Sequence, residues 1–122
     1  MPLTINELNS KLTSLDVLIT SSVDFEDVIA VISTYYNYQQ SAFKNGELVN
    51  QAGTNEGSCK IFSYAQLNGL SEQATLNCFG QYYRDDVLKH PLGDDHGNIR
   101  NFIKSGWSGI KFEHAALVLA NA

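Results

Sequence analysis

The sequence contains few of the residues that define several large protein classes. Only 2 of its 122 residues are Cys and 2 are Pro, which excludes a disulfide-stapled scaffold and a proline-rich linker. Basic residues are also scarce, with 8 Lys and Arg against 13 Asp and Glu and a net charge of −5. Nucleic acids and anionic membranes attract basic proteins, so we expect neither as a partner.

Long hydrophobic runs are absent too. The longest apolar runs, such as Val28–Ile32 and Ala115–Ala120, are far shorter than the roughly 20 residues that span a bilayer. Residues 1–7 lack the basic and apolar regions of a secretory signal peptide. We therefore expect a cytoplasmic protein with reduced thiols, while the Ser- and Thr-rich residues 1–22 also suit an uncleaved export signal.

What is present fits one domain over residues 1–122. Apolar residues make up 43% of the chain, which is enough for a single core. Most of them recur at the spacing of a helix face, and shorter segments flank an Asn-Gly turn. We predict a mainly helical α+β fold with about five helices and a small antiparallel sheet of two or three strands.

The predicted helices have recognisable beginnings. Thr4 caps the first, whose apolar face includes Leu15, and Asp24 caps the second at about 25–36. The other helices are predicted at about 59–68 after a Ser58 cap, at about 72–88, and at about 96–104 after Asp94 or Asp95. Gly80 inside the fourth helix costs about 1 kcal/mol relative to Ala, so we expect another segment to pack closely there.

The strand signals are fewer. Asn45-Gly46 predicts a short hairpin between residues 38–44 and 47–50, because these residue types favour the positive φ angles of a type I′ turn. The alternating segment Trp107–Phe112 is a candidate third strand. We expect residues 114–122 to form a loose tail.

Three stretches are unusually polar, namely Asn55–Lys60, Tyr82–Asp85 and Asp94–Phe102. In the first, Cys59 follows the predicted cap, where the positive end of a helix and Lys60 favour a thiolate. His96 is a candidate base for this thiol, with Asn98 or Asp95 as its orienting partner, so the candidate catalytic residues are Cys59, His96 and Asn98. The alternative is that Cys59 is buried as a small apolar side chain.

The same stretches offer a site for a small anion. Arg84 and Arg100 are suited to hold a phosphate or carboxylate together with a helix beginning at Ser58. The alternative is that both arginines link loops inside the protein. The candidate ligand-binding residues are Asn55, Glu56, Ser58, Lys60, Tyr83, Arg84 and Arg100.

The acidic residues near His96 raise the question of a metal site, since Asp and His coordinate divalent ions. These acids are Asp85, Asp86, Asp94 and Asp95. The last two precede a predicted helix, where acids serve as caps, and the pattern of a calcium-binding loop is absent. We expect no metal and no cofactor.

Longer motifs along the chain connect it with a known family. They are Ala42–Gly46, Asn55–Lys60, Gly69–Ser71, Cys78–Gly80 with Tyr82–Arg84, His96–Arg100 and Gly106–Phe112. Through these motifs, residues 5–113 resemble the HopJ family of small bacterial proteins, which are named as type III effectors. The resemblance implies an effector that binds a protein partner, in a host when a type III system exports it. It brings no reaction, cofactor or catalytic residue with it.

Three hypotheses about function follow. We expect a non-enzymatic binding protein. The alternatives are a thiol-dependent hydrolase or transferase that uses Cys59 and His96, and a small-anion-binding protein that uses the two arginines. The thiol hypothesis requires sulfur and imidazole to meet in a hollow, and the anion hypothesis requires the guanidinium groups to converge there.

Overall fold

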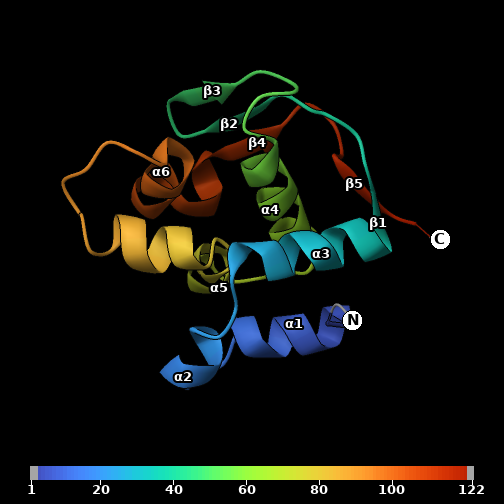
Figure 1. Ribbon diagram of the computed structural model, residues 1–122. Coiled ribbons are helices and arrows are strands. Elements are labelled where there is room, and N and C mark those ends of the chain that lie inside the picture. Colours follow the sequence, from blue (N-terminus) through green and yellow to red (C-terminus); the bar gives the residue numbers. More distant parts are fainter. Residues whose placement is uncertain (1–2, 121–122) are drawn as a thin grey trace.

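The computed structural model describes residues 3–120 and shows a mainly helical α+β fold (Figure 1), which confirms the predicted class. Within this range the helices are α1 (Ile5–Leu12), α2 (Val17–Thr20), α3 (Phe25–Tyr35), α4 (Glu56–Leu67), α5 (Glu72–Asn77) and α6 (Gly97–Ser105). A π-helical segment, η1, covers Tyr82–Val87, and a 3-10 turn, η2, covers Gly106–Gly109. The strands are β1 (Tyr36–Tyr38), β2 (Phe43–Asn45), β3 (Leu48–Asn50), β4 (Ile110–Phe112) and β5 (Leu117–Leu119).

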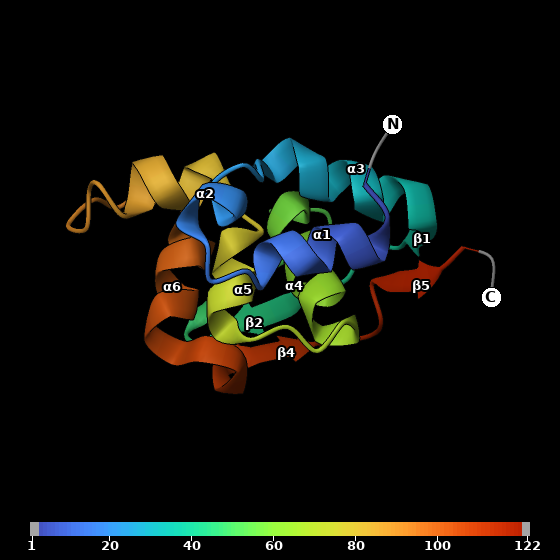
Figure 2. The same ribbon diagram turned by 90° about the horizontal axis from the view of Figure 1, so that it is seen from below.

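Helix α4 passes through the middle of the molecule, with β2–β4 on one side and the N-terminal helices on the other (Figures 1 and 2). Helix α3 packs against α4, and α1 packs against α3. Phe62 of α4 marks the centre of the core and is fully buried. Its ring centroid lies 5.0 Å from that of Phe102, 5.5 Å from that of Phe79 and 6.0 Å from that of Phe43.

The predicted hairpin and third strand are confirmed. Strands β2 and β3 pair antiparallel across a turn in which Gly46 has a φ of 62°. Strand β4 joins the other edge of β2, so the strand order is β3-β2-β4. The expected loose tail is wrong, because β5 pairs antiparallel with β1 and places Leu117 in the core. Residues 121–122 of that tail lie outside the described residues.

Some predicted helix beginnings are confirmed and others are wrong. Thr4 and Glu7 form a reciprocal capping box at α1, and Asp24 and Asp27 form one at α3. Helix α4 begins at Glu56, so Ser58 lies inside its first turn and does not cap it.

Gly80 interrupts the predicted helix at 72–88. Helix α5 ends at Asn77, Gly80 has a φ of 57°, and the chain continues as η1. A Cβ on Gly80 would overlap the backbone of Asp24 and Phe25 at the beginning of α3. The expected close packing at Gly80 is therefore confirmed. The predicted continuous helix is wrong, because Gly80 adopts a left-handed backbone where it contacts the beginning of α3.

The first helix ends at Leu12, earlier than its predicted apolar face requires. Leu15 lies beyond α1 and is fully exposed. It is followed by α2, where Val17 and Leu18 are 75% and 80% exposed and no residue is buried. In the part of the chain described by the structure, no helix combines the length and apolar character needed to cross a membrane.

Candidate functional site

A hollow of about 230 Å³ opens where α4 and α6 begin, and we call it the inter-helix pocket. Its lining residues are Phe25, Asn55, Gly57, Ser58, Phe79, Tyr82, His96, Gly97, Asn98 and Ile99. All three polar stretches singled out in the sequence thus contribute to one pocket, the second of them through Tyr82. Of the candidate site residues, the pocket brings together Asn55, Ser58, His96 and Asn98.

The two helix beginnings at the pocket have the same unusual backbone. The N-cap residues Asn55 and His96 each have a φ of 50°, in the left-handed region. Neither side chain accepts a capping hydrogen bond from its helix. The N-cap of α6 is His96, so the expected cap at Asp94 or Asp95 is wrong. Among residues 3–120, no hydrogen-bond acceptor is found for the first-turn amides of residues 56–58 and 97–99. Both helices therefore present unsatisfied N–H groups and the positive ends of their dipoles near the pocket.

Each first turn contains a glycine, and the two have different surroundings. Gly57 packs beneath Phe25, since a Cβ at that glycine would come 2.9 Å from the Phe25 ring. Gly97 is the first residue of α6 and is exposed. Without a side chain, Gly97 lets a ligand approach the N–H groups of α6 closely, whereas Gly57 makes room for the aromatic wall of the pocket.

A buried network of Asn side chains holds the two helix beginnings in place. The Asn98 amide donates to Asn50 Oδ1 at 3.0 Å, and the Asn50 amide donates back to Asn98 Oδ1 at 3.1 Å. Asn45 donates to the same Asn98 oxygen at 3.1 Å, and Asn55 donates to Asn50 Oδ1 at 2.8 Å. The β2–β3 hairpin thereby fixes both N-termini. The sequence analysis did not include Asn45 and Asn50 among the candidate site residues. The one signal for them in the sequence was their polar character at the ends of short apolar strands.

Aromatic side chains form another wall of the pocket, from Phe25, Phe79 and Tyr82. The rings of Phe25 and Tyr82 lie 5.2 Å apart. The Tyr82 ring also stacks on the His96 imidazole at 5.3 Å, with 28° between the planes. Sequence analysis proposed Tyr83 as the ligand-binding residue, but Tyr83 is buried and its neighbour Tyr82 faces the pocket.

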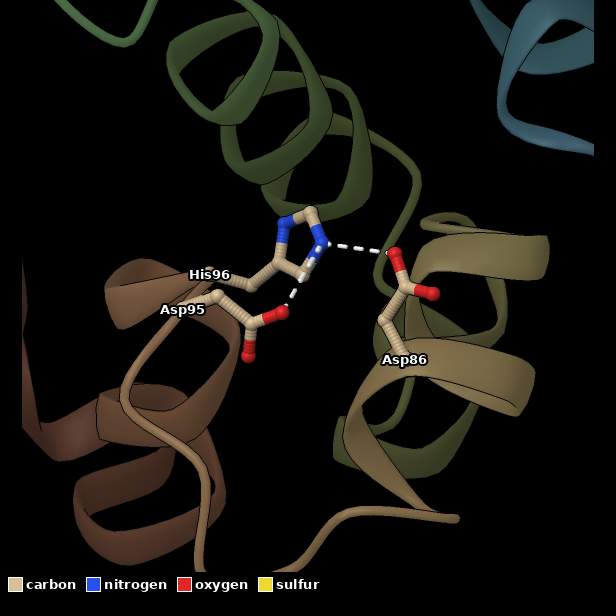
Figure 3. Close-up of side chains that lie close together, drawn as sticks. All are labelled: Asp86, Asp95 and His96. Atoms are coloured by element: carbon tan, nitrogen blue, oxygen red, sulfur yellow. Dashed lines mark hydrogen bonds and ion pairs between the residues drawn. The ribbon is translucent and has the colours of Figure 1, made fainter.

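The His96 imidazole links the pocket to a pair of carboxylates (Figure 3). Its Nε2 atom lies 2.8 Å from Asp86 Oδ2 and 3.9 Å from Asp95 Oδ2. Asp95 is held by Arg100, whose Nη2 lies 2.6 Å from Asp95 Oδ1. The hydrogen bond from Arg100 lowers the pKa of the Asp95 carboxyl below its ordinary value, which keeps this group charged.

The structure does not bring Cys59 to His96. The Cys59 side chain is 1% exposed, lies outside the pocket lining, and has Sγ 3.7 Å from the backbone oxygen of Ser41. Burial raises the pKa of the Cys59 thiol above its ordinary value, the opposite of the expected activation. Loss of hydration outweighs the helix dipole and Lys60 here, because successive residues point about 100° apart on a helix and Cys59 faces the core.

Glu56 and Lys60 also face away from the pocket. Glu56 Oε1 accepts hydrogen bonds from the Tyr38 hydroxyl at 3.1 Å and from the Gln40 amide at 3.2 Å. The Lys60 ammonium lies 4.7 Å from the centre of the Tyr38 ring. Both residues therefore tie α4 to β1 and the segment after it.

The two candidate arginines make internal contacts and do not converge. Arg84 donates to the backbone oxygen of Val23 and to Asp24 Oδ1, which fastens η1 to the beginning of α3. Arg100 donates to the backbone oxygens of His90 and Asp95 and to the Asp95 carboxylate. Neither guanidinium group lines the inter-helix pocket.

The profile of the family described as "HopJ type III effector protein" matches residues 7–117. The chain belongs to the HopJ family. This membership agrees with the resemblance seen in the motifs, which placed the matching region at residues 5–113.

Comparison with known proteins finds a solved structure with the same fold. A crystal structure of an "unknown function protein VPA0580" is similar, with a TM-score of 0.90 and 44% sequence identity. The similarity covers 98% of this chain and 96% of that chain. A search among curated proteins finds no match.

Proposed function

We propose that this HopJ-family protein is a non-enzymatic binding protein whose inter-helix pocket takes a small anion. The observation that carries the proposal is the meeting of two helix beginnings, neither capped by its own side chain, at one pocket. Each helix N-terminus stabilises a nearby anion by roughly 0.3–1 kcal/mol, and by up to about 2 kcal/mol where it is partly buried. Two N-termini around one anion add their effects.

The pocket walls indicate the remainder of the ligand. Phe25, Phe79 and Tyr82 offer apolar ring faces, which favour a flat apolar group joined to a carboxylate or phosphate. A volume of about 230 Å³ is below the roughly 300–1,000 Å³ of pockets for drug-sized ligands, so the ligand is small. The placement of Cys59 in the core supports binding over thiol chemistry, since its sulfur does not face the pocket.

A thermal-shift experiment tests this function. Phenyl phosphate and benzoate are expected to raise the melting temperature, because a ligand that binds only the folded state stabilises it. Benzyl alcohol, which keeps the ring and lacks the anionic charge, is expected to leave the melting temperature unchanged. If neither anion stabilises the wild-type protein, the proposed function is wrong.

A charge placed in the pocket gives the matched variant. Ser58→Asp puts a carboxylate beside the anion site and should abolish the shift, while an acid in the first turn of α4 favours the helix. Ser10→Asp adds the same charge at an exposed position of α1, outside the pocket lining, and should leave the shift intact. An equal response in both variants would show that the anions bind elsewhere.

A second candidate function is that of an exported effector with a host protein as its partner. Membership of a family described as type III effectors favours it. The test is to express the full chain in bacteria with a working type III system and in a matched strain with an inactive secretion ATPase. The effector function predicts export in the first strain alone. Retention in the cytoplasm of both strains would leave the cytoplasmic binding protein as the function.

A further inference from the structure

We propose that Asp86, Asp95 and His96 form a binding site for a divalent first-row transition-metal ion. One ligand atom from each residue lies within 4.8 Å of the other two. Asp86 comes from η1, whereas Asp95 and His96 come from the segment that leads into α6, so the fold brings two separate segments together (Figure 3). The sequence analysis expected no metal because it assigned Asp95 to a helix cap, a role that Asp95 does not have.

The spacing of the three atoms is close to that of a coordination shell. Tetrahedral zinc, with bonds of about 2.0–2.1 Å, holds its ligand atoms roughly 3.3–3.4 Å apart. The two separations from His96 Nε2, 2.8 Å to Asp86 and 3.9 Å to Asp95, lie on either side of that value. Movements of about half an ångström in the two carboxylates would bring both oxygens to the zinc-like separation from Nε2.

The imidazole nitrogen by itself cannot satisfy both carboxylates. Nε2 carries at most one hydrogen, and the 2.8 Å contact directs that hydrogen to Asp86. Asp95 Oδ2, at 3.9 Å, is beyond hydrogen-bonding distance from the same nitrogen. A cation in place of the hydrogen would contact both oxygens and the nitrogen lone pair, and the displaced proton would leave to solvent.

Neighbouring side chains hold Asp95 and His96 in fixed orientations, as hydrogen-bonding partners around a metal site hold its ligands. Arg100 holds Asp95 Oδ1 at 2.6 Å and leaves Oδ2 toward His96. The stacked Tyr82 ring fixes the plane of the imidazole. Hydrogen-bonded partners of this kind position coordinating carboxylates and imidazoles in metal sites.

The ligand set selects the class of ion. An imidazole nitrogen suits zinc and its first-row neighbours, whereas Ca²⁺ and Mg²⁺ prefer sets made of oxygens. The side chains of His96, Asp86 and Asp95 are 30%, 46% and 57% exposed, which leaves room for water to complete the shell. The site is therefore a three-ligand site open to solvent.

A metal here would also set the chemistry of the inter-helix pocket. With Nε2 bound to the ion, the neutral imidazole carries its hydrogen on Nδ1, on the side of the ring turned away from Asp86 (Figure 3). Because His96 lines the pocket, a metal ion on Nε2 would fix the tautomer of an imidazole at the pocket wall. This coupling rests on the proposed function, whereas the metal site itself does not.

Calorimetric titration of the untagged, reduced protein with ZnCl₂ tests the site. We expect saturable binding of one equivalent, and little heat with CaCl₂ at the same concentration. Asp86→Asn and His96→Gln should each weaken zinc binding by at least about tenfold. The matched controls are Asp85→Asn, which changes the neighbouring carboxylate paired with Lys89, and His114→Gln, which changes an exposed imidazole elsewhere; both should bind zinc as the wild type does.

Two outcomes overturn the site. One is an absence of zinc binding by the wild type, and the other is equal binding by the Asp86 and Asp85 variants, which would indicate adventitious surface binding only. A measurement on the wild type removes any dependence on the folding of the variants: substoichiometric Mn²⁺ should broaden the amide resonances of residues 85–87 and 95–97 before others. Broadening elsewhere would contradict the assignment.

The metal site and the anion pocket can fail separately. Asp86 does not line the pocket, and Ser58 is not a metal ligand. Ser58→Asp should therefore lose the response to phenyl phosphate and keep zinc binding. Zinc binding without any anion response would refute the proposed function alone, and an anion response without zinc binding would refute the metal site alone.

Discussion

The beginnings of α4 and α6 share a backbone shape and differ in what surrounds them. Both N-cap residues have a φ of 50° and neither caps its helix through its side chain. At α4, Asn55 is joined to Asn50 by neutral amide hydrogen bonds. At α6, His96 faces two carboxylates, one of which is held by Arg100. Neutral amides thus fix both beginnings, through Asn55 at α4 and Asn98 at α6, and the beginning of α6 is in addition surrounded by groups that carry charge.

If the proposed metal site is occupied, this difference gives the two kinds of group separate tasks. The neutral amides hold the geometry of both helix beginnings. The imidazole and the carboxylates bind the cation, which changes the charge at the α6 side of the pocket.

The largest expected effect is on the charged side, at Gly80. Gly80→Ala should lower the free energy of unfolding by more than about 4 kcal/mol, because its Cβ would overlap the backbone of α3 and displace η1, which carries Asp86. Urea unfolding followed by circular dichroism measures the loss. Gly69→Ala is the control, since Gly69 also has a positive φ of 62° but has open space around it. That variant should lose about 1–2 kcal/mol, and similar losses in both would contradict the close contact.

The next effect tests the neutral amide network, which holds both helix beginnings. Asn98→Ala should cost about 1–3 kcal/mol, because the buried amides of Asn45 and Asn50 each lose the side-chain oxygen of Asn98 as an acceptor, and Asn50 Oδ1 loses a donor. The same urea measurement applies. Asn37→Ala, at an exposed position of β1, should stay within about 0.5 kcal/mol of the wild type. A small loss at Asn98 would mean that the amide network does not hold the helix beginnings.

The last effect concerns the buried thiols, among them Cys59 in the first turn of α4, and is absent at neutral pH. Burial raises the pKa values of Cys59 and Cys78, so the folded protein keeps both protonated at a pH where the unfolded chain releases them. The folded state then binds more protons than the unfolded state, and stability must fall as pH rises above about 8.5. Each thiol contributes a decrease of up to about 1.4 kcal/mol per pH unit.

Urea unfolding between pH 7 and pH 10 checks this decrease. Cys78→Ala should have a shallower decrease, because one of the two buried thiols is gone. Iodoacetamide at neutral pH should label neither cysteine until the protein unfolds. Rapid labelling of Cys59 in the folded protein would contradict the burial and restore the thiol hypothesis.

The parts of the fold predicted correctly depend on local signals. Thr4 with Glu7 specifies the beginning of α1 within four residues, and Asn45-Gly46 specifies the hairpin turn. The pairing of β1 with β5 was missed because it joins residues 36–38 to 117–119, and neither segment carries a sequence pattern that identifies the strand it pairs with. Long-range pairing is decided by packing of the whole core.

The site was also predicted only in part, because local signals mark some of its residues and not others. Ser58, His96 and Asn98 share the pocket, as the polar stretches suggested, because each lies in the first turn or cap of a helix. Arg84 and Arg100 were proposed for an anion but bind backbone oxygens of Val23 and His90. Every residue has such an oxygen, so a sequence cannot show which ones a guanidinium group will reach. The left-handed backbone of His96 has only a weak signal in its residue type, because His adopts positive φ more often than most residues and still rarely does so.

The most direct test of the central claim is to titrate ¹⁵N-labelled protein with phenyl phosphate and follow the backbone amide resonances. If both helix beginnings hold one anion, the amides of Gly57 and Ser58 and those of Gly97 and Asn98 will shift together, with a single dissociation constant. If the amides of one helix shift and those of the other stay in place, or if neither pair moves, the two beginnings do not form a common site.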